Sequence, residues 1–310
     1  MPNLSKNLKK DLKKVESLMR KNLSKEPVVK DLYDYIFDKS GKKVRASISL
    51  ISSYGMNKNQ QNRVKLAAII ELLHTATLVH DDIIDNSDLR RGRTTVNIAW
   101  SNSHGVLIGD FIYSKAFMLM NEIGNFKVID ELSSATNKIA EGELMQLANK
   151  NNLDTSLQQL KKISYYKTGR LFEASAKSAA MLSGKSTSFI ENISKAAKLI
   201  GIVFQVRDDL LDYGISKGNI GKPEMQDILE DKITYLVSYV WNIFFTLVFV
   251  FGTIYNLSNS VSDESWMVYW KYQIYINVVF SFIIIIWLSL IHISEPTRPR
   301  LISYAVFCLK

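Results

Sequence analysis

Proline placement is the feature that most limits the fold of this chain of 310 residues. The five prolines are Pro2, Pro27, Pro223, Pro296 and Pro299. Because proline removes a backbone donor and breaks helices, the proline-free span from Val28 to Lys222 can form uninterrupted helices. Apolar residues in that span recur at three- and four-residue spacing, without the sustained alternation that is typical of strands. The pattern predicts an all-α fold with roughly eight helices there.

The composition sets the broad class of the protein. Hydrophobic residues make up 47% of the chain and charged residues 22%, so it can bury a sizeable core and global disorder is excluded. The net charge of +9 suits polyanionic partners such as diphosphates, acidic lipids or nucleic acid. The single cysteine, Cys308, excludes disulfide frameworks and cysteine-based zinc sites. The N-terminal residues lack the apolar stretch of a secretory signal, so we expect a cytoplasmic protein.

The composition changes near residue 236. No charged residue occurs from Ile233 to Ser262 or from Tyr272 to Ile291. Within these stretches, the runs 237–256 and 272–291 are long and apolar enough to span a bilayer. We therefore expect a helical domain over residues 1–236 and a separate apolar segment over 237–310.

Two interpretations of the segment 237–310 compete: a C-terminal membrane hairpin, or sequence that is foreign to this gene. The stretch from Leu288 to Arg300 resembles translated sequencing-adapter DNA rather than any protein family. A frameshifted or misassembled reading frame is the leading interpretation, in which C-terminal helices of the domain are missing or replaced. The apolar surface left uncovered would then favour aggregation or membrane insertion, with little activity.

The chemistry of the sequence lies in two aspartate clusters with the same D-D-x-x-D spacing. The first cluster is Asp81, Asp82 and Asp85, and the second is Asp208, Asp209 and Asp212. On a helix this spacing brings the carboxylates of each cluster to one face. Hard carboxylate oxygens suit Mg²⁺, which usually completes its shell with water and substrate phosphate oxygens. Two arginines that follow the first cluster, Arg90 and Arg91, can grip phosphate with forked donors.

An acidic triplet on a helix is usually a solvated face, but the flanks of these two clusters argue for burial. Apolar residues surround both of them, including Val79 and Ile83 at the first and Val203 and Leu210 at the second. Burying a carboxylate without a partner costs several kcal/mol of folding free energy. Two such clusters on core-like helices predict a shared metal site.

Further motifs complete a family pattern. They are Ser40–Arg45, Glu71–Asp82, Gly109–Phe111, Ala140–Glu143, Lys167–Phe172, Phe204–Gln205 and Gly221–Pro223. With these motifs the chain resembles the trans-isoprenyl (polyprenyl) diphosphate synthase family across about residues 30–236. The sequence around Ile139–Glu143 and Leu153–Thr155 is most similar to that of bacterial octaprenyl diphosphate synthases of ubiquinone synthesis.

The resemblance implies a bundle of mostly antiparallel helices around a central cavity, usually in a homodimer. It implies two or three Mg²⁺ ions, held by Asp81, Asp82, Asp85, Asp208, Asp209 and Asp212, and it places Lys167 with these aspartates in catalysis. It assigns isopentenyl diphosphate to Lys42, Arg45, His74 and Arg91. It assigns the allylic diphosphate to Arg90, Lys167, Thr168, Gln205, Lys222 and Lys232.

The implied reaction joins an allylic diphosphate, such as farnesyl diphosphate, to successive isopentenyl diphosphates. Ionisation of the allylic C–O bond needs no protein nucleophile, in keeping with the lack of a Ser-His or Cys-His arrangement. Ala76 and Thr77 lie one helical turn before Asp81, where the growing tail must pass, and Leu73 is a candidate for the floor. Small side chains there predict a long product, with octaprenyl diphosphate the expected one. Its release would involve contact with a membrane surface.

Three alternatives stay open. A terpene cyclase could use the first aspartate motif, but it would not need the isopentenyl diphosphate site that Lys42, Arg45 and His74 supply. A membrane-associated, non-catalytic subunit or an inactive chimeric synthase would account for the segment 237–310. Nucleic-acid binding is not expected, because no aromatic residues interleave with the basic ones.

Overall fold

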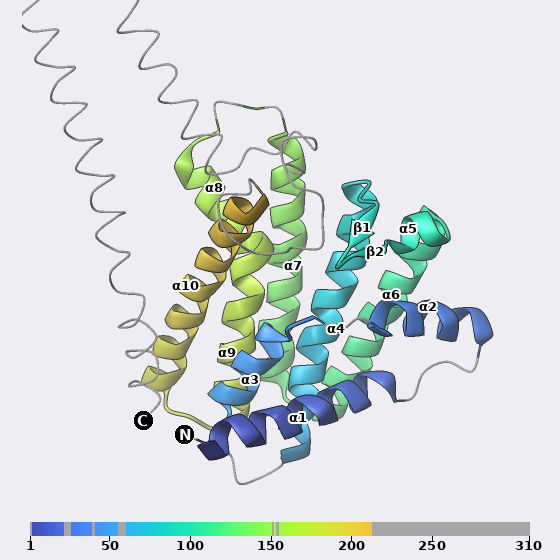
Figure 1. Ribbon diagram of the computed structural model, residues 1–310. Helices are drawn as coiled ribbons and strands as arrows, with labels where there is room; N and C mark the ends of the chain where they lie inside the picture. Colours follow the sequence, from blue (N-terminus) through green and yellow to red (C-terminus); the bar gives the residue numbers. More distant parts are fainter. Residues whose placement is uncertain are drawn as a thin grey trace, which may run out of the picture. The chain divides into compact units, whose positions relative to one another are not determined.

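The computed structural model describes residues 2–21, 26–38, 41–54, 60–150, 152 and 155–212 (Figure 1). The contacts divide the chain into two units, Met1–Ser238 and Tyr239–Lys310. The second unit lies outside the described residues, and so do Lys222, Lys232 and both apolar runs. The domain division and the interpretations of the segment 237–310 therefore stay predictions.

The described part of the chain is all-α, as predicted, apart from one short hairpin. The long helices are α1 (Pro2–Arg20), α2 (Pro27–Asp38), α3 (Val44–Ser52), α4 (Gln60–Ile84), α6 (Asn102–Ile123), α7 (Phe126–Ala148), α8 (Leu157–Ser164), α9 (Arg170–Leu182) and α10 (Thr187–Asp212). The shorter elements are β1 (Leu89–Arg90), β2 (Arg93–Thr94), α5 (Val96–Ala99) and the π-helical turn Tyr165–Gly169. Between residues 28 and 212, the described helices of eight residues or more agree with the expected eight.

Local signals in the sequence set several helix boundaries. Pro27 is the first residue of α2, where its missing N–H has no helical partner to lose. The Ser186 hydroxyl accepts from the Phe189 N–H and so caps the start of α10. Ser156 and Gln159 form a reciprocal capping box at the start of α8. Gly124 ends α6 in the left-handed conformation that glycine adopts without strain.

The hairpin is an element that the sequence did not predict. Its strands pair Leu89 with Thr94 and Arg90 with Arg93. The two residues between them, Arg91 and Gly92, both have positive φ, as the tightest hairpin turns require. Arginine is uncommon at such a φ, so the turn carries none of the usual Asn-Gly or Asp-Gly signal.

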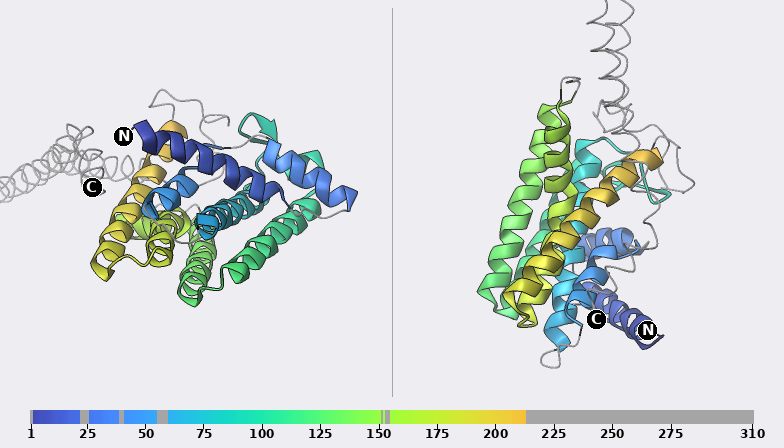
Figure 2. Two further views of the ribbon diagram at one scale, coloured as in Figure 1. Left: turned by 90° about the horizontal axis from the view of Figure 1, so that it is seen from below. Right: turned by 90° about the vertical axis from the view of Figure 1, so that its left-hand side faces the viewer.

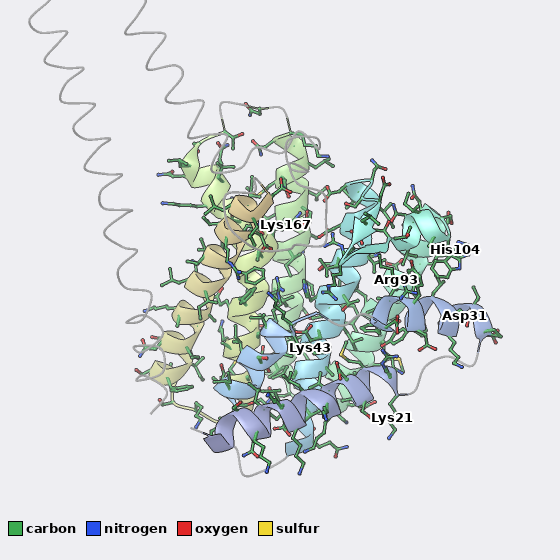
Figure 3. All side chains as sticks on the ribbon, viewed as in Figure 1. Lys21, Asp31, Lys43, Arg93, His104 and Lys167 are labelled. Carbon is green, nitrogen blue, oxygen red and sulfur yellow. The ribbon has the colours of Figure 1, made fainter. Side chains whose placement is uncertain are left out.

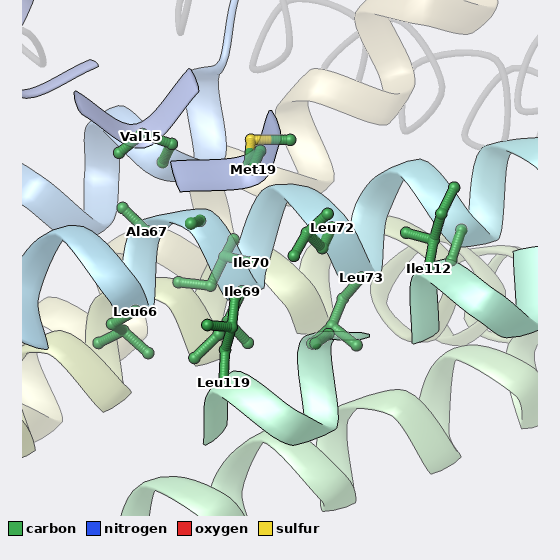
Figure 4. Packing of buried hydrophobic residues seen from close by; sticks show 14 of the residues in the cluster. Val15, Met19, Leu66, Ala67, Ile69, Ile70, Leu72, Leu73, Ile112 and Leu119 are labelled. Carbon is green, nitrogen blue, oxygen red and sulfur yellow. The ribbon is translucent and has the colours of Figure 1, made fainter. Parts of the chain in front are cut away.

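Helix α4 forms the centre of the core. It packs against α1, α3, α6 and α9, and the view from below in Figure 2 shows these helices around it. Figure 4 shows Val15 and Met19 of α1 on one side of α4, and Ile112 and Leu119 of α6 on the other. Every α4 residue from Leu66 to Leu73 is buried. The first aspartate motif therefore lies at the end of a helix that is held in place by packing on all sides.

In the described residues, no helix combines the length and the hydropathy needed to cross a bilayer. The runs 237–256 and 272–291 lie outside those residues.

Candidate active site

A cavity of about 340 Å³ brings together most of the residues that the two aspartate motifs and their flanks predicted. Predicted residues that line it are Arg45, His74, Thr77, Asp81, Asp85, Arg90, Arg91, Lys167, Thr168, Gln205, Asp208, Asp209 and Asp212. They come from α3, α4 and the turn after it, the hairpin, the π-turn and α10, so segments far apart in the chain meet at one site. The volume is in the range of small-molecule sites.

The first aspartate cluster divides between two sides of α4. Asp81 and Asp85 line the cavity. Asp82 is not among the cavity's lining residues: it is buried, and its Oδ1 accepts from Arg90 Nε at 2.5 Å. The structure thus places two carboxylates of this cluster in the cavity and the third against the arginine that follows it.

The second cluster, on α10, faces the cavity with all three carboxylates. Asp209 and Asp212 are buried. A chain of hydrogen bonds orients Asp209: the Thr168 hydroxyl donates to Gln205 Oε1 at 2.6 Å, and Gln205 Nε2 donates to Asp209 Oδ1 at 2.8 Å. Thr168 and Gln205 therefore act on this carboxylate as well as lining the cavity.

The donor set fits a hard divalent cation in type and placement, since carboxylates of α4 and α10 line the same cavity. Among the described residues, however, no three acidic or histidine side chains already converge closely enough to hold one ion. The aspartates are thus brought to one cavity but not into one coordination shell.

Cationic side chains form another part of the cavity wall. Arg45 is buried and its Nη1 lies 3.0 Å from His74 Nε2, while its guanidinium carbon lies 4.5 Å above the Phe172 ring. Burial lowers the pKa of Arg45 to about 10, against the opposing effect of the Glu71 carboxylate. Burial, followed by the nearby Arg45 and Arg91 charges, lowers the pKa of His74 well below its ordinary value. His74 is therefore a neutral imidazole, which can accept a hydrogen bond from Arg45.

Gly41 lies against the guanidinium of Arg91. A Cβ at this glycine would lie 2.6 Å from Arg91 Nη2, so a larger residue would displace the guanidinium from its present position. Burial, with Arg90 as the next cause, lowers the pKa of Arg91. Lys42, which follows the glycine, is exposed and is not among the residues that line the cavity. The predicted isopentenyl diphosphate residues thus divide into three that line the cavity and one outside it.

Glu71 was not predicted as a site residue, although it begins one of the motifs noted above. It is buried on α4, and its Oε1 accepts from the backbone N–H of Ala46 at 3.0 Å. Burial raises the pKa of Glu71, while the Ala46 N–H and the charges of Arg45, Lys43 and Arg91 oppose that rise. Its burial beside Arg45 and Arg91 indicates a role in the site, and that burial arises only when the chain folds.

Lys167 reaches the cavity from the π-turn, beside α7 (Figure 3). Its Nζ lies 2.7 Å from Glu143 Oε2 and 2.9 Å from Gln146 Oε1. Burial raises the pKa of Glu143 to about 7; Lys167 opposes the rise, and Asp81 and Asp85 add to it. Glu143 and Gln146 were missed as site residues, although Glu143 belongs to one of the motifs noted above.

The residues predicted to control chain length do not lie together on the cavity wall. Thr77 and its neighbour Leu78 line the cavity. Leu73 and Ala76 are completely buried in the core, and the cavity of this structure does not reach them.

Comparisons with known proteins agree with the resemblance. A family model described as polyprenyl synthetase matches residues 26–244. Octaprenyl diphosphate synthase of Escherichia coli (strain K12) is 40% identical over 207 residues, 67% of this chain and 64% of that protein. A geranyl-diphosphate-specific all-trans-nonaprenyl-diphosphate synthase of Rhodobacter capsulatus is 40% identical over 212 residues, 68% of this chain and 65% of that protein. This chain thus spans just under two thirds of the length of both relatives.

A solved structure extends the likeness to the fold. The polyprenyl synthase from Caulobacter crescentus, crystallised with calcium and isoprenyl diphosphate, matches with a TM-score of 0.71 and 32% sequence identity. The match covers 74% of this chain and 71% of that chain. Because the family model spans more than half of the sequence and the fold agrees, this chain belongs to the polyprenyl synthetase family.

Proposed function

We propose that this protein is a prenyltransferase that condenses an allylic diphosphate with isopentenyl diphosphate to build a long all-trans polyprenyl diphosphate. The observation that carries the proposal is a single cavity lined by carboxylates of both aspartate motifs and by Arg45, Arg90 and Arg91. Carboxylates suit divalent cations, and the arginine cluster suits diphosphates. One cavity can therefore receive both the allylic diphosphate, which ionises, and isopentenyl diphosphate, which attacks it.

Mg²⁺ is the metal that the donor set suits best, in two or three ions that would be held by Asp81 of α4, Asp85 just after it and the three aspartates of α10. When bound, it would neutralise the charge that develops on the departing diphosphate. Asp82 would contribute by holding Arg90, to which it lies 2.5 Å.

The residues of the chain would bind and orient the two substrates. Arg90, Lys167 and Thr168 would hold the allylic diphosphate, and Arg45, His74 and Arg91 the isopentenyl diphosphate. Their donors would stabilise the diphosphate as it leaves with the electron pair of the allylic C–O bond. The isopentenyl double bond then forms the new C–C bond with the allylic cation. The carbocation that results loses a proton from a neighbouring carbon, and the released diphosphate is a suitable acceptor for that proton.

Apolar side chains of the cavity would keep water from the carbocation. Leu78 of α4, Leu160 and Ile163 of α8 and Phe204 of α10 share the cavity with the charged residues. A carbocation that met water would be quenched to an alcohol, so this apolar lining protects the reaction.

The expected product is octaprenyl diphosphate for a quinone side chain. The name of the E. coli relative supports that length, and the R. capsulatus relative shows that similar sequences are described with a longer product. Thr77 is the residue of this chain best placed to affect length, because it lines the cavity one turn before Asp81.

A homodimer is the expected assembly. Helices α6 and α7 expose large apolar side chains, namely Val106, Leu107, Phe117, Met118, Phe126, Leu144 and Leu147. A second copy that covered this surface would remove it from water. The cytoplasmic location and the contact with a membrane surface stay predictions.

The test is prenyl transfer by the full-length chain with Mg²⁺, farnesyl diphosphate and labelled isopentenyl diphosphate. Asp81→Ala should lower turnover by about a thousandfold, as the loss of charge stabilisation at a leaving group does. Asp88→Ala is the matched control, because this nearby exposed aspartate is not among the cavity's lining residues. An Asp81→Ala variant with wild-type turnover would contradict the metal assignment. Absence of Mg²⁺-dependent transfer, both in the wild-type chain and in a chain whose residues 237–310 are replaced by the C-terminal segment of a related octaprenyl diphosphate synthase, would contradict the function.

A further inference from the structure

The helix that carries Lys167 and Thr168 contains one π-helical turn, Tyr165–Gly169, between α8 and α9. The Arg170 backbone N–H donates to the Tyr165 carbonyl, five residues earlier instead of four. Such a turn inserts one residue into a helix and so rotates the side chains before it relative to those after it. Lys167 and Thr168 reach the cavity from within this insertion.

Glycines on two neighbouring helices let the π-turn pack closely between them. A Cβ at Gly142 of α7 would lie 2.8 Å from the Lys167 backbone nitrogen. A Cβ at Gly201 of α10 would lie 2.6 Å from the Gly169 Cα. The close packing fixes where the turn lies, but it does not choose between a π-register and an α-register.

A polar network outside the cavity joins the turn to α9 and α10. The Tyr165 hydroxyl donates to Glu173 Oε2 at 2.5 Å, and the Ser194 hydroxyl donates to Glu173 Oε1 at 2.9 Å. Lys198 Nζ lies 4.1 Å from the centroid of the Tyr165 ring. The glutamate therefore ties the first residue of the π-turn to two helices at once.

The same glutamate belongs to a wider charged cluster. Arg170 Nη1 lies 3.7 Å from Glu173 Oε2 and 2.6 Å from Glu131 Oε1. Lys177 Nζ lies 2.5 Å from Glu131 Oε2, at the other end of the cluster from Tyr165. Arg170 and Glu131 are buried, so this cluster is held in a fixed arrangement by its own ion pairs.

The hydrogen bond between Tyr165 and Glu173 depends on the inserted residue. In a regular α-helix, residues eight apart are rotated by about 80° around the axis, since each residue turns by about 100°. One inserted residue reduces that angle to about 20°, because the remaining seven make nearly two full turns. The two side chains therefore share a face in the π-register and separate in the α-register.

We propose that the Tyr165–Glu173 pair holds the π-register and thereby positions Lys167 and Thr168 for the allylic diphosphate. Neither residue of the pair is among those that line the cavity, so both are positioning residues. Without the bond, the turn can relax toward the α-register, which rotates Lys167 and Thr168 away from their present directions. Arg45 and His74 lie on α3 and α4, so the isopentenyl side should not respond. The expected effect on substrates rests on the proposed function.

Tyr165→Phe tests the pair, because it removes one oxygen and keeps the ring against Lys198. The full-length variant should show a KM for farnesyl diphosphate raised roughly tenfold, the size expected for one lost hydrogen bond to a charged acceptor. Its KM for isopentenyl diphosphate should stay within about twofold, below the effect of one lost hydrogen bond. Glu173→Gln keeps an oxygen that can accept from Tyr165 and should retain near-wild-type values. Lys177→Met is the matched control, since it removes a charge of the same cluster whose ion pair is with Glu131 and not with Glu173.

A second measurement does not depend on activity. Hydrogen exchange of the Arg170 amide, which makes the five-residue bond, should be faster in Tyr165→Phe than in Lys177→Met. Equal exchange in the two variants, or KM values for both substrates that rise together with a loss of Tm, would overturn the inference. Absence of product from both the wild-type chain and the chain with residues 237–310 replaced, combined with faster Arg170 exchange in Tyr165→Phe, would refute the proposed function and support the register inference.

Discussion

The two aspartate motifs have the same spacing but are held in different ways. In both, the middle carboxylate is buried: Asp82 on α4 and Asp209 on α10. Asp82 is paired with the charged Arg90, whereas Asp209 accepts from the neutral amide of Gln205. The spacing therefore brings carboxylates to one helix face, and the partners that tertiary structure supplies decide which of them remain directed at the cavity.

The helices that carry the motifs also differ in their surroundings. Helix α4 is covered by other helices, and the residues from Leu66 to Leu73 are all buried. Helix α10 exposes large apolar side chains along its length, including Leu199 at 63% and Val203 at 66% exposure. The expectation that both motif helices are core-like thus applies to α4 and only to one side of α10. Apolar content alone does not distinguish the two cases.

Matched leucine truncations should show the largest contrast between the two helices. Leu73→Ala in α4 should lower the free energy of unfolding by about 2–5 kcal/mol, since Leu73 is completely buried and truncation leaves a cavity. Leu199→Ala in α10 should change it by less than about 0.5 kcal/mol, because this side chain is mostly exposed. Urea denaturation measures both, and similar losses would mean that α10 is covered in solution.

Glu143 of α7, which feels the charges of Asp81 and Asp85, should add a pH dependence to the stability of the protein. Its raised pKa, about 7 against an ordinary 4.5, means that the folded state holds this proton more tightly than the unfolded state. The stabilisation is therefore full below pH 4.5 and is lost as the pH rises toward about 7, by about 3 kcal/mol at most.

Glu143→Gln should remove that loss. The measurement is the free energy of unfolding of both proteins, without Mg²⁺ or diphosphate, at pH values between 4.5 and 8. Parallel curves for the wild type and the variant would show that Glu143 titrates normally in the folded protein.

Asparagine substitutions of the two middle carboxylates should give the smallest of these contrasts. Asp82→Asn removes the negative charge that pairs with Arg90 and should lower the free energy of unfolding by about 1–3 kcal/mol. Asp209→Asn keeps an oxygen that can accept from Gln205, and should cost less than about 1 kcal/mol. Thermal unfolding in the absence of Mg²⁺ compares the two variants, and a larger loss for Asp209→Asn would reverse the comparison drawn above.

Much of the site could be predicted because its residues lie at helical spacing. Asp81 and Asp85 share a face by the geometry of any α-helix, and both line the cavity. The same rule also grouped Asp82 with them, yet that carboxylate is bound to Arg90. Helical spacing describes a face about a third of the circumference wide, and it cannot say which member a neighbouring element will bind.

The residues that escaped prediction have their roles through contacts distant in sequence. Glu143 became a site residue because α7 lies beside the π-turn, where Lys167 Nζ is 2.7 Å away. Glu71 and Ala46 meet because α3 packs on α4. Ala76 was expected to face the growing tail, but it lies in the core beyond the reach of the cavity.

The sequence by itself determined the helical class, several helix boundaries, the two aspartate motifs and, through its motifs, the family. These properties depend on residues within a few positions of one another, where backbone geometry is known in advance. Tertiary structure alone decided which carboxylates face the cavity, that His74 is neutral beside Arg45, and that a π-turn presents Lys167 and Thr168. Those properties depend on burial and on partners from other helices, and packing brings such partners together without a local signal in the chain.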